Sequence, residues 1–306
     1  MNNTTLIYNK VLDIIGDENR IKRDELLKAH TTFRIGGPAD LMVMPASADE
    51  IVKLTDLFKT ENIKYIILGN GSNVLASDAG YRGVVIKIGK EMSYVSRTEK
   101  KITAGAGTIL SAVSSEAAKA SLTGMEFASG IPGSIGGAVF MNAGAYGGEM
   151  SQIVTAVTAV MPDGTIKKIT KEDGFDFGYR HSVFCDNGAV IVEVEVELTE
   201  GVSEEIYAYM KDLTGRRVEK QPLNFPSAGS TFKRPEGYFA GKLIQDAGCK
   251  GLSVGGALVS PKHAGFIVNN GGATSEDILN LIKLVQMRVK DEFGVDLETE
   301  VRIIGE

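Results

Sequence analysis

The chain has 306 residues, enough for about two to three domains, and a net charge of −6, which argues against the basic face that nucleic-acid binding usually requires. Its two cysteines are far apart in sequence, so they predict neither a disulfide framework nor a metal or redox pair, and a reducing compartment fits best. No stretch approaches the roughly 18 continuous apolar residues of a membrane span, and we expect a cytoplasmic protein that binds neither nucleic acid nor membrane.

The first ninety residues predict a small β-α-β unit that follows a polar, helix-like N-terminal region. A helix is expected over residues 49–59, because Ile51, Leu54 and Phe58 recur at helical spacing. Short apolar runs on both sides of this helix indicate strands. The predicted strands lie at 41–44, 65–68 and 83–88.

The rest of the chain mixes helices with strands, so the predicted fold class is α+β. A helix at 109–120 precedes a glycine-rich loop, and the alternation of valine with glutamate over 190–198 predicts a half-exposed antiparallel strand. Thr274 and Asp277 have the spacing of a capping box ahead of an amphipathic helix. The other predicted elements are a helix at 203–219, a proline-punctuated loop at 222–235 and a closing strand at 295–304.

Two glycine-rich segments are the strongest sign of a ligand site. The first, Gly69-Asn70-Gly71-Ser72-Asn73, follows the predicted strand at 65–68, and turns at the carboxyl ends of strands commonly bind ligands through free N–H groups that attract phosphate. The second segment places eight glycines in residues 124–148. Ordering glycine costs more chain entropy than ordering other residues, so packing alone is a weak explanation. Together the segments predict two backbone walls around one nucleotide.

Three motifs give the chain a resemblance to a known family. Thr32-Phe33-Arg34-Ile35-Gly36-Gly37, the motif at 69–73 and Gly130-Ile131-Pro132-Gly133-Ser134-Ile135-Gly136-Gly137 resemble motifs of the UDP-N-acetylenolpyruvoylglucosamine reductases, flavoenzymes of peptidoglycan synthesis. The resemblance extends over about 31–305. It implies a two-subdomain FAD-binding fold of the vanillyl-alcohol-oxidase type and a C-terminal α+β substrate-binding domain. The expected domains are residues 1–92 and 93–200 for FAD and residues 201–306 for substrate.

The resemblance also implies that the two glycine-rich walls hold FAD without a covalent bond. The residues expected to contact it are Arg34, Gly69, Asn70, Gly71, Ser72, Asn73, Gly130, Pro132, Gly133, Ser134, Gly136, Gly137, Asn142 and Gly144. No metal is expected. NADPH is the implied hydride donor.

Three residues carry the implied chemistry, although their sequence patterns alone indicate a strand end, a turn and a solvated strand. Arg180 matches the family's catalytic arginine, whose fixed charge binds the substrate carboxylate through two parallel hydrogen bonds. Ser230 matches the proton donor to the carbon next to that carboxylate. Glu300 matches a glutamate that assists protonation or stabilises the enol.

The resemblance implies further contacts to a UDP-sugar substrate. The spacing between Arg180 and Ser230 suggests the more compact subclass, which lacks the tyrosine-bearing loop of longer relatives. A monomer is expected. The predicted substrate-binding residues are Tyr179, Lys220, Lys233, Arg234, Lys242 and Gln245.

The implied reaction is reduction of UDP-N-acetylglucosamine enolpyruvate to UDP-N-acetylmuramate by NADPH through FAD. Two alternatives belong to other functional classes. A flavin-dependent oxidase would use oxygen and often attaches FAD through histidine, which neither glycine-rich segment contains. A non-catalytic sugar-nucleotide-binding protein would need the phosphate loops but neither Ser230 nor Glu300.

Overall fold

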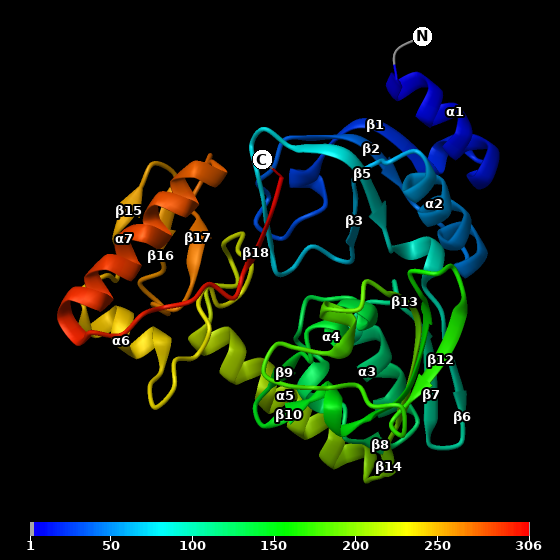
Figure 1. Ribbon diagram of the computed structural model, residues 1–306. Coiled ribbons are helices and arrows are strands. Elements are labelled where there is room, and N and C mark those ends of the chain that lie inside the picture. The colour runs from blue at the N-terminus through cyan, green and yellow to red at the C-terminus, as the bar shows by residue number, and fades with distance from the viewer. Residues whose placement is uncertain (1–2, 306) are drawn as a thin grey trace. The chain divides into compact units, whose positions relative to one another are not determined.

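The computed structural model describes residues 3–305, which form two compact units (Figure 1). Two segments near the N-terminus belong with the C-terminal part, where strand β4 (Val74–Ala76) pairs in parallel with β18 (Arg302–Ile304). This grouping differs from linear domain boundaries near 92 and 200, which remain a prediction. The first unit comprises residues up to Arg23, Leu41–Asn70 and Gly83–Arg216, and the second comprises Asp24–Asp40, Gly71–Arg82 and residues from Arg217 onward.

The predicted β-α-β unit is present near the N-terminus. Helix α2 (Ala48–Thr60) begins at Ser47, whose hydroxyl accepts the N–H of Glu50 at 3.2 Å, and it buries the apolar face that predicted it. The sheet beside it has the order β1-β2-β5-β3, and β3 pairs in parallel with β5. The bounds are α1 (Asn3–Ile15), β1 (Ile21–Leu26), β2 (Pro38–Val43), β3 (Tyr65–Leu68) and β5 (Tyr81–Lys87).

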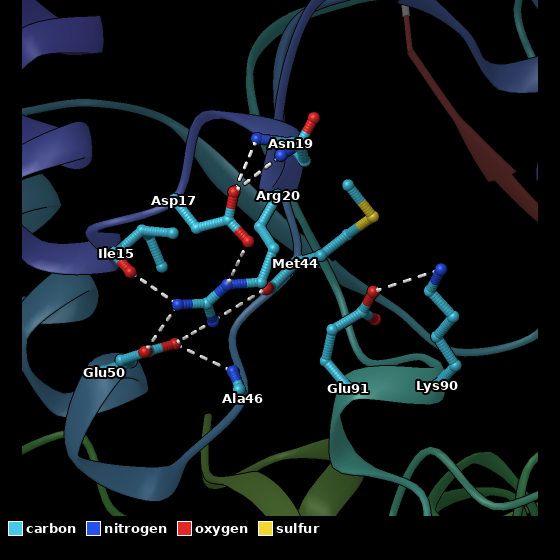
Figure 2. Close-up of polar contacts among 9 residues, drawn as sticks. All are labelled: Ile15, Asp17, Asn19, Arg20, Met44, Ala46, Glu50, Lys90 and Glu91. Atoms are coloured by element: carbon cyan, nitrogen blue, oxygen red, sulfur yellow. Dashed lines mark hydrogen bonds and ion pairs between the residues drawn. The ribbon is translucent and has the colours of Figure 1, made fainter.

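Arg20 connects three segments of the first unit (Figure 2). Its guanidinium donates to the two carboxylate oxygens of Glu50 at 2.7 and 3.0 Å and to the Ile15 carbonyl, in the last turn of α1, at 2.5 Å. A further bond reaches the Met44 carbonyl at 3.4 Å. The Arg20 side chain is only 16% exposed, so this bidentate pair fixes the end of α1 against the first turn of α2.

A five-stranded antiparallel sheet forms the second half of the first unit, in the order β12-β11-β13-β7-β6. Helices α3 and α4 pack against β7 and β13 (Figure 1). The valines of β13 are buried and its glutamates are half-buried or exposed, as the alternation predicts. The bounds are β6 (Val95–Thr98), β7 (Lys101–Gly105), α3 (Leu110–Lys119), α4 (Ile135–Phe140), β11 (Val154–Val160), β12 (Ile166–Thr170) and β13 (Val190–Glu197).

Two short strand pairs and one long helix are the remaining elements that precede the C-terminal part of the second unit. Over residues 3–305, no helix combines the length and apolarity needed to cross a bilayer, and no group of three or more His, Cys, Asp or Glu side chains is arranged to hold a metal ion. The pairs are β8 (Leu122–Thr123) with β14 (Thr199–Glu200) and β9 (Gly144–Ala145) with β10 (Gly148–Glu149), and the helix is α5 (Ser203–Lys220).

The second unit contains a small antiparallel sheet, β15-β16-β17, against which α7 packs (Figure 1). The predicted capping box of α7 is confirmed, because Thr274 Oγ1 accepts the Asp277 N–H at 3.0 Å and Asp277 Oδ2 accepts the Thr274 N–H at 3.1 Å. The Asp277 carboxylate accepts the N–H groups of Thr274 and Gly256, and these bonds lower its pKa. The bounds are α6 (Ala240–Asp246), β15 (Ser253–Val254), β16 (Ala257–Val259), β17 (Ile267–Asn269) and α7 (Ser275–Phe293).

The closing strand is shorter than the sequence predicts. Only Arg302–Ile304 forms a regular strand, rather than the whole of 295–304. The preceding residues bond instead to a loop, because the Lys233 N–H donates to the Glu298 carbonyl at 2.9 Å and the Glu300 N–H donates to the Thr231 carbonyl at 2.8 Å. The segment before β18 therefore pairs with the loop at 231–233 and not with β4.

Candidate active site

The first glycine-rich wall begins at the carboxyl end of β3, as predicted. Gly69 and Asn70 follow β3 directly, and the register places Leu68 opposite Lys87. The Lys87 ammonium donates a hydrogen bond to the Gly69 carbonyl. Burial lowers the pKa of this ammonium from 10.5 to about 8, an effect that the Glu91 carboxylate opposes. This half-buried basic group behind the turn is one that sequence reasoning missed.

The two glycine-rich walls touch each other within the first unit. The Asn70 side chain donates from Nδ2 to the Pro132 carbonyl at 2.5 Å. A β-carbon at Gly69 would lie 2.8 Å from the Ser134 hydroxyl, closer than real β-carbons approach. Ser134 also caps α4, where its Oγ accepts the Gly137 N–H at 3.4 Å. The segments expected to face one ligand are therefore neighbours in space.

Packing inside the protein explains several glycines of the second wall. A β-carbon at Gly136 would lie 2.8 Å from the β-carbon of Ala106, and one at Gly148 would lie 2.5 Å from the Phe127 ring. Gly144 has a similar clash, at 2.8 Å, with the opposing strand. The expectation that packing is a weak explanation is therefore wrong at these three positions, because close backbone-to-side-chain approach requires glycine there.

Polar contacts hold the rest of the second wall. The loop at 130–134 leads into α4, and the Gly133 carbonyl accepts the first backbone N–H of α3 at 2.9 Å. Asn142 is 3% exposed and has a φ of 42°. Its Nδ2 donates to the Gly178 carbonyl at 3.1 Å, so the wall is joined to the segment that carries Arg180.

The remainder of the first motif belongs to the second unit. Gly71 has a φ of 63°, and its carbonyl accepts the Thr32 N–H at 3.1 Å. Asn73 donates from Nδ2 to the Glu300 carbonyl at 3.1 Å. Arg34 also has a positive φ, 56°, which is uncommon outside glycine. Asn73 therefore joins the motif to the segment that carries the predicted catalytic Glu300.

Arg180 lies in a tight turn of the first unit. The backbone N–H groups of Gly178 and His181 donate to each other's carbonyls at 3.1 and 3.3 Å, and Arg180 has a φ of 55°. Its guanidinium lies 5.3 Å from the centroid of the Tyr179 ring. The buried Ser182 hydroxyl donates to a carbonyl at the end of α4 at 2.8 Å. Arg180 is thus a strained residue on an anchored turn, and strained residues of this kind are common at functional sites.

Ser230 and Glu300 lie on neighbouring segments of the second unit. The Glu300 N–H donates to the carbonyl of Thr231, the residue after Ser230, at 2.8 Å. Thr231 is buried, and its hydroxyl accepts the first backbone N–H of β17 at 3.0 Å. The structure therefore brings two of the three predicted catalytic residues together, whereas Arg180 belongs to the other unit.

His263 lies beside Ser230, and sequence reasoning missed it. A β-carbon at Gly265 would lie 3.3 Å from Ser230 Oγ and 3.2 Å from His263 Nδ1, so both groups flank the same glycine. His263 Nδ1 accepts the Gly265 N–H at 3.1 Å, which leaves the proton of the neutral ring on Nε2. Burial lowers the pKa of His263 below 6.5, and the nearby Lys250 acts in the same direction. Both effects favour the neutral form of the imidazole beside Ser230.

The predicted substrate-binding residues of the second unit contact other protein groups. Lys233 Nζ lies 2.9 Å from Glu298 Oε2, and Lys242 Nζ lies 2.6 Å from a carboxylate one turn further along α6. The Arg234 guanidinium covers the exposed Phe239 ring at 4.0 Å. Solvent-exposed ion pairs of this kind are weak, so an anionic ligand can displace the carboxylates. Lys220 ends α5, and Gln245 lies in α6.

Most of the chain matches models of known protein families. The family described as FAD binding domain matches residues 39–170, and the family described as UDP-N-acetylenolpyruvoylglucosamine reductase, C-terminal domain, matches residues 221–304. The UDP-N-acetylenolpyruvoylglucosamine reductase of Clostridium novyi is 51% identical over 298 residues, which cover 97% of this chain and 96% of that protein. That of Clostridioides difficile is 49% identical over 306 residues and covers both proteins completely.

Solved structures agree with these sequence matches. The crystal structure of UDP-N-acetylenolpyruvylglucosamine reductase from Thermus caldophilus is 37% identical, covers 93% of this chain and 98% of that one, and superposes with a TM-score of 0.79. p-Cresol methylhydroxylase is 11% identical over 66% of this chain and 44% of its own, with a TM-score of 0.50, which is a similarity of fold alone. The fold is therefore an α+β FAD-binding fold followed by a C-terminal α+β domain.

Proposed function

Because the chain belongs to the UDP-N-acetylenolpyruvoylglucosamine reductase family, we propose that Arg180, Ser230 and Glu300 are its catalytic residues. The chain is an FAD-dependent oxidoreductase that reduces UDP-N-acetylglucosamine enolpyruvate to UDP-N-acetylmuramate for peptidoglycan, with NADPH as the hydride donor. When bound, FAD supplies the hydride transfer that amino-acid side chains cannot carry. The protein's own residues must bind, orient and protonate the substrate.

The two glycine-rich walls fit a bound dinucleotide. Their contacts through Asn70, Pro132 and Ser134 hold two turns next to each other in the first unit. The proposed cofactor contacts come from both turns and from Arg34. They are Gly69, Asn70, Gly71, Ser72 and Asn73 of the first wall and Gly130, Pro132, Gly133, Ser134, Gly136, Gly137, Asn142 and Gly144 of the second.

Arg180 is proposed to bind the substrate carboxylate. Negative charge develops there as hydride adds to the terminal carbon of the enolpyruvyl group. A guanidinium stays charged and can bind both carboxylate oxygens with parallel hydrogen bonds. The anchored turn and the φ of 55° support this role, because a fixed donor needs no reorganisation when charge develops.

Ser230 is proposed to protonate the carbon next to the carboxylate, with Glu300 assisting protonation or stabilising the enol. The observation that carries the proposal is the 2.8 Å bond from the Glu300 N–H to the Thr231 carbonyl, which fixes the two residues on adjoining segments. A hydroxyl is a weak acid, so it can act only on a strongly basic enolate beside it.

Substrate binding is proposed to involve a cationic surface of the second unit together with Tyr179. The diphosphate and carboxylate of a UDP-sugar are anionic, which suits lysine and arginine side chains held in weak, exposed pairs. The proposed contacts are Tyr179, Lys220, Lys233, Arg234, Lys242 and Gln245. We also propose that the chain acts as a cytoplasmic monomer, binds no nucleic acid, and has functional domains that divide near residues 92 and 200.

Anaerobic single-turnover spectroscopy tests the proposal. NADPH should bleach the flavin absorption, and added UDP-N-acetylglucosamine enolpyruvate should restore it. Ser230→Ala should be bleached at the wild-type rate but lose recovery, because only the second half-reaction needs the proton. Ser227→Ala is the matched control, since Thr32 bonds only its backbone carbonyl, and it should behave as wild type. Equal loss of both steps in Ser230→Ala would contradict the proton-donor role, and a chain that binds no flavin would overturn the activity itself.

A further inference from the structure

Lys87 places a positive charge where the fold alone does not need one. It ends β5 directly after three buried residues and is itself half-buried, whereas lysine side chains are mostly exposed. The acceptor of its hydrogen bond, the Gly69 carbonyl, is neutral and cannot compensate the charge. The Glu91 carboxylate favours the charged form of Lys87, but it also lies 3.9 Å from the exposed ammonium of Lys90. Burial at this position therefore has a cost that packing does not explain.

The hydrogen bond sets the direction of one peptide group in the first glycine-rich wall. No peptide among residues 3–305 is cis, and a trans peptide points its carbonyl and N–H to opposite sides. Because the Gly69 carbonyl points toward Lys87, the N–H of Asn70 points away from it. The Asn70 side chain is held in turn by the Pro132 carbonyl. The Gly69–Asn70 peptide is thus held through its carbonyl by Lys87, and its N–H points away from Lys87.

We propose that Lys87 is a positioning residue for the FAD diphosphate: it orients the Gly69–Asn70 peptide so that the Asn70 N–H meets the phosphate oxygens. Its charge lies on the far side of that peptide and adds attraction for the anion. The inference rests on the proposed assignment of the first glycine-rich wall to FAD. It explains why a basic side chain lies at the carboxyl end of β5, since a bound diphosphate supplies negative charge that the neutral Gly69 carbonyl does not.

The affinity of the deflavinated full-length chain for FAD tests this role. Lys87→Met, which keeps the length of the side chain without its charge, should weaken binding about 10- to 100-fold in a fluorescence titration, the range for losing a charged hydrogen bond. The visible spectrum of the FAD-saturated variant should remain that of wild type, because the flavin ring is untouched. Lys87→Arg should recover most of the affinity. Lys90→Met is the matched control, since Lys90 is 91% exposed, and its affinity should stay within twofold of wild type.

Each other result overturns the inference. Affinity of Lys87→Met within twofold of wild type, an altered spectrum at saturation, or failure of Lys87→Arg to recover binding would each contradict the positioning role of Lys87 at the diphosphate. If Lys87→Met does not fold by circular dichroism, Lys87→Gln provides the same comparison. Gly69→Ala distinguishes a failure of the Lys87 inference from a failure of the FAD assignment on which it rests. If Gly69→Ala leaves FAD affinity unchanged, the first glycine-rich wall does not bind FAD. If it weakens FAD binding while Lys87→Met does not, only the Lys87 inference fails.

Discussion

Single residues with constrained geometry carry the proposed chemistry. Arg180 holds a left-handed backbone that costs a non-glycine residue about 1 kcal/mol or more, and the polar anchors around its turn maintain it. Ser230 and Glu300 lie on segments that a backbone bond at Thr231 joins. In both places the main chain supplies the precision, so conservative side-chain changes should alter chemistry more than folding.

Arg180→Lys tests whether geometry or charge matters at this turn. Lysine keeps the positive charge but cannot form two parallel bonds to a carboxylate. We expect reoxidation of the reduced flavin by substrate to slow about 100-fold, while reduction by NADPH is unchanged, measured by stopped-flow absorbance. Arg97→Lys, at an exposed arginine of β6, should change neither rate. Equal slowing of both half-reactions would instead indicate a general disturbance of the cofactor site.

His263 gives the second unit a pH dependence. Its pKa in the folded protein lies below the 6.5 that is usual in the unfolded chain. At a pH between the folded and the unfolded pKa, the unfolded chain therefore binds more protons than the folded one. The free energy of unfolding should therefore fall as pH decreases below 6.5 and be unaffected by this group above pH 7.5. His263→Asn, which keeps an acceptor near the position of Nδ1, should lose less stability than wild type in urea titrations at pH 7.5 and 5.0. Parallel losses in the two proteins would show that His263 does not titrate in this window.

Helices and strands differ in how far the sequence determines them. Helix α2 and the α7 capping box were predictable, because periodicity and capping involve residues within one or two turns. The extent of the closing strand was not, since it depends on the loop at Thr231 bonding to Glu300, a contact across nearly seventy positions. The requirement for Gly136 was not predictable for the same reason, because the clash comes from Ala106, which follows β7 and is distant in sequence.

The Arg20–Glu50 pair should couple α1 to α2. Both side chains are less than 20% exposed, so Glu50→Gln leaves a guanidinium that is poorly compensated and partly desolvated. We expect a loss of about 2 kcal/mol in the free energy of unfolding, from urea denaturation followed by circular dichroism. The control is Glu61→Gln, which breaks the more exposed pair with Lys10 and should cost under about 0.5 kcal/mol. Similar losses in both variants would contradict a specific role for the buried pair.

At the scale of the whole molecule, the sequence motifs and the compact units do not coincide. The motif at 69–73 is continuous in sequence, yet Gly69 and Asn70 belong to the first unit and Gly71 onward to the second. The sequence predicted the motif as one wall, and its local composition could not reveal this division or the charge of Lys87 behind it. A lysine directly after the apolar run at 84–86 was the available signal. It is a weak signal, because lysine at a strand end is usually solvated.

FAD should stabilise the whole chain through the two glycine-rich walls that we propose bind it. A ligand that binds only the folded state raises the free energy of unfolding by about 2.7 kcal/mol at 100 times its Kd and about 4.1 kcal/mol at 1,000 times. The thermal midpoint of the deflavinated protein should therefore rise steadily with FAD concentration in scanning calorimetry. Asn70→Ala, which removes the contact to Pro132, should shift the whole dependence to higher FAD concentration. Asn9→Ala, at an exposed position of α1, should follow wild type, and an identical dependence in Asn70→Ala would mean that contact between the walls does not support FAD binding.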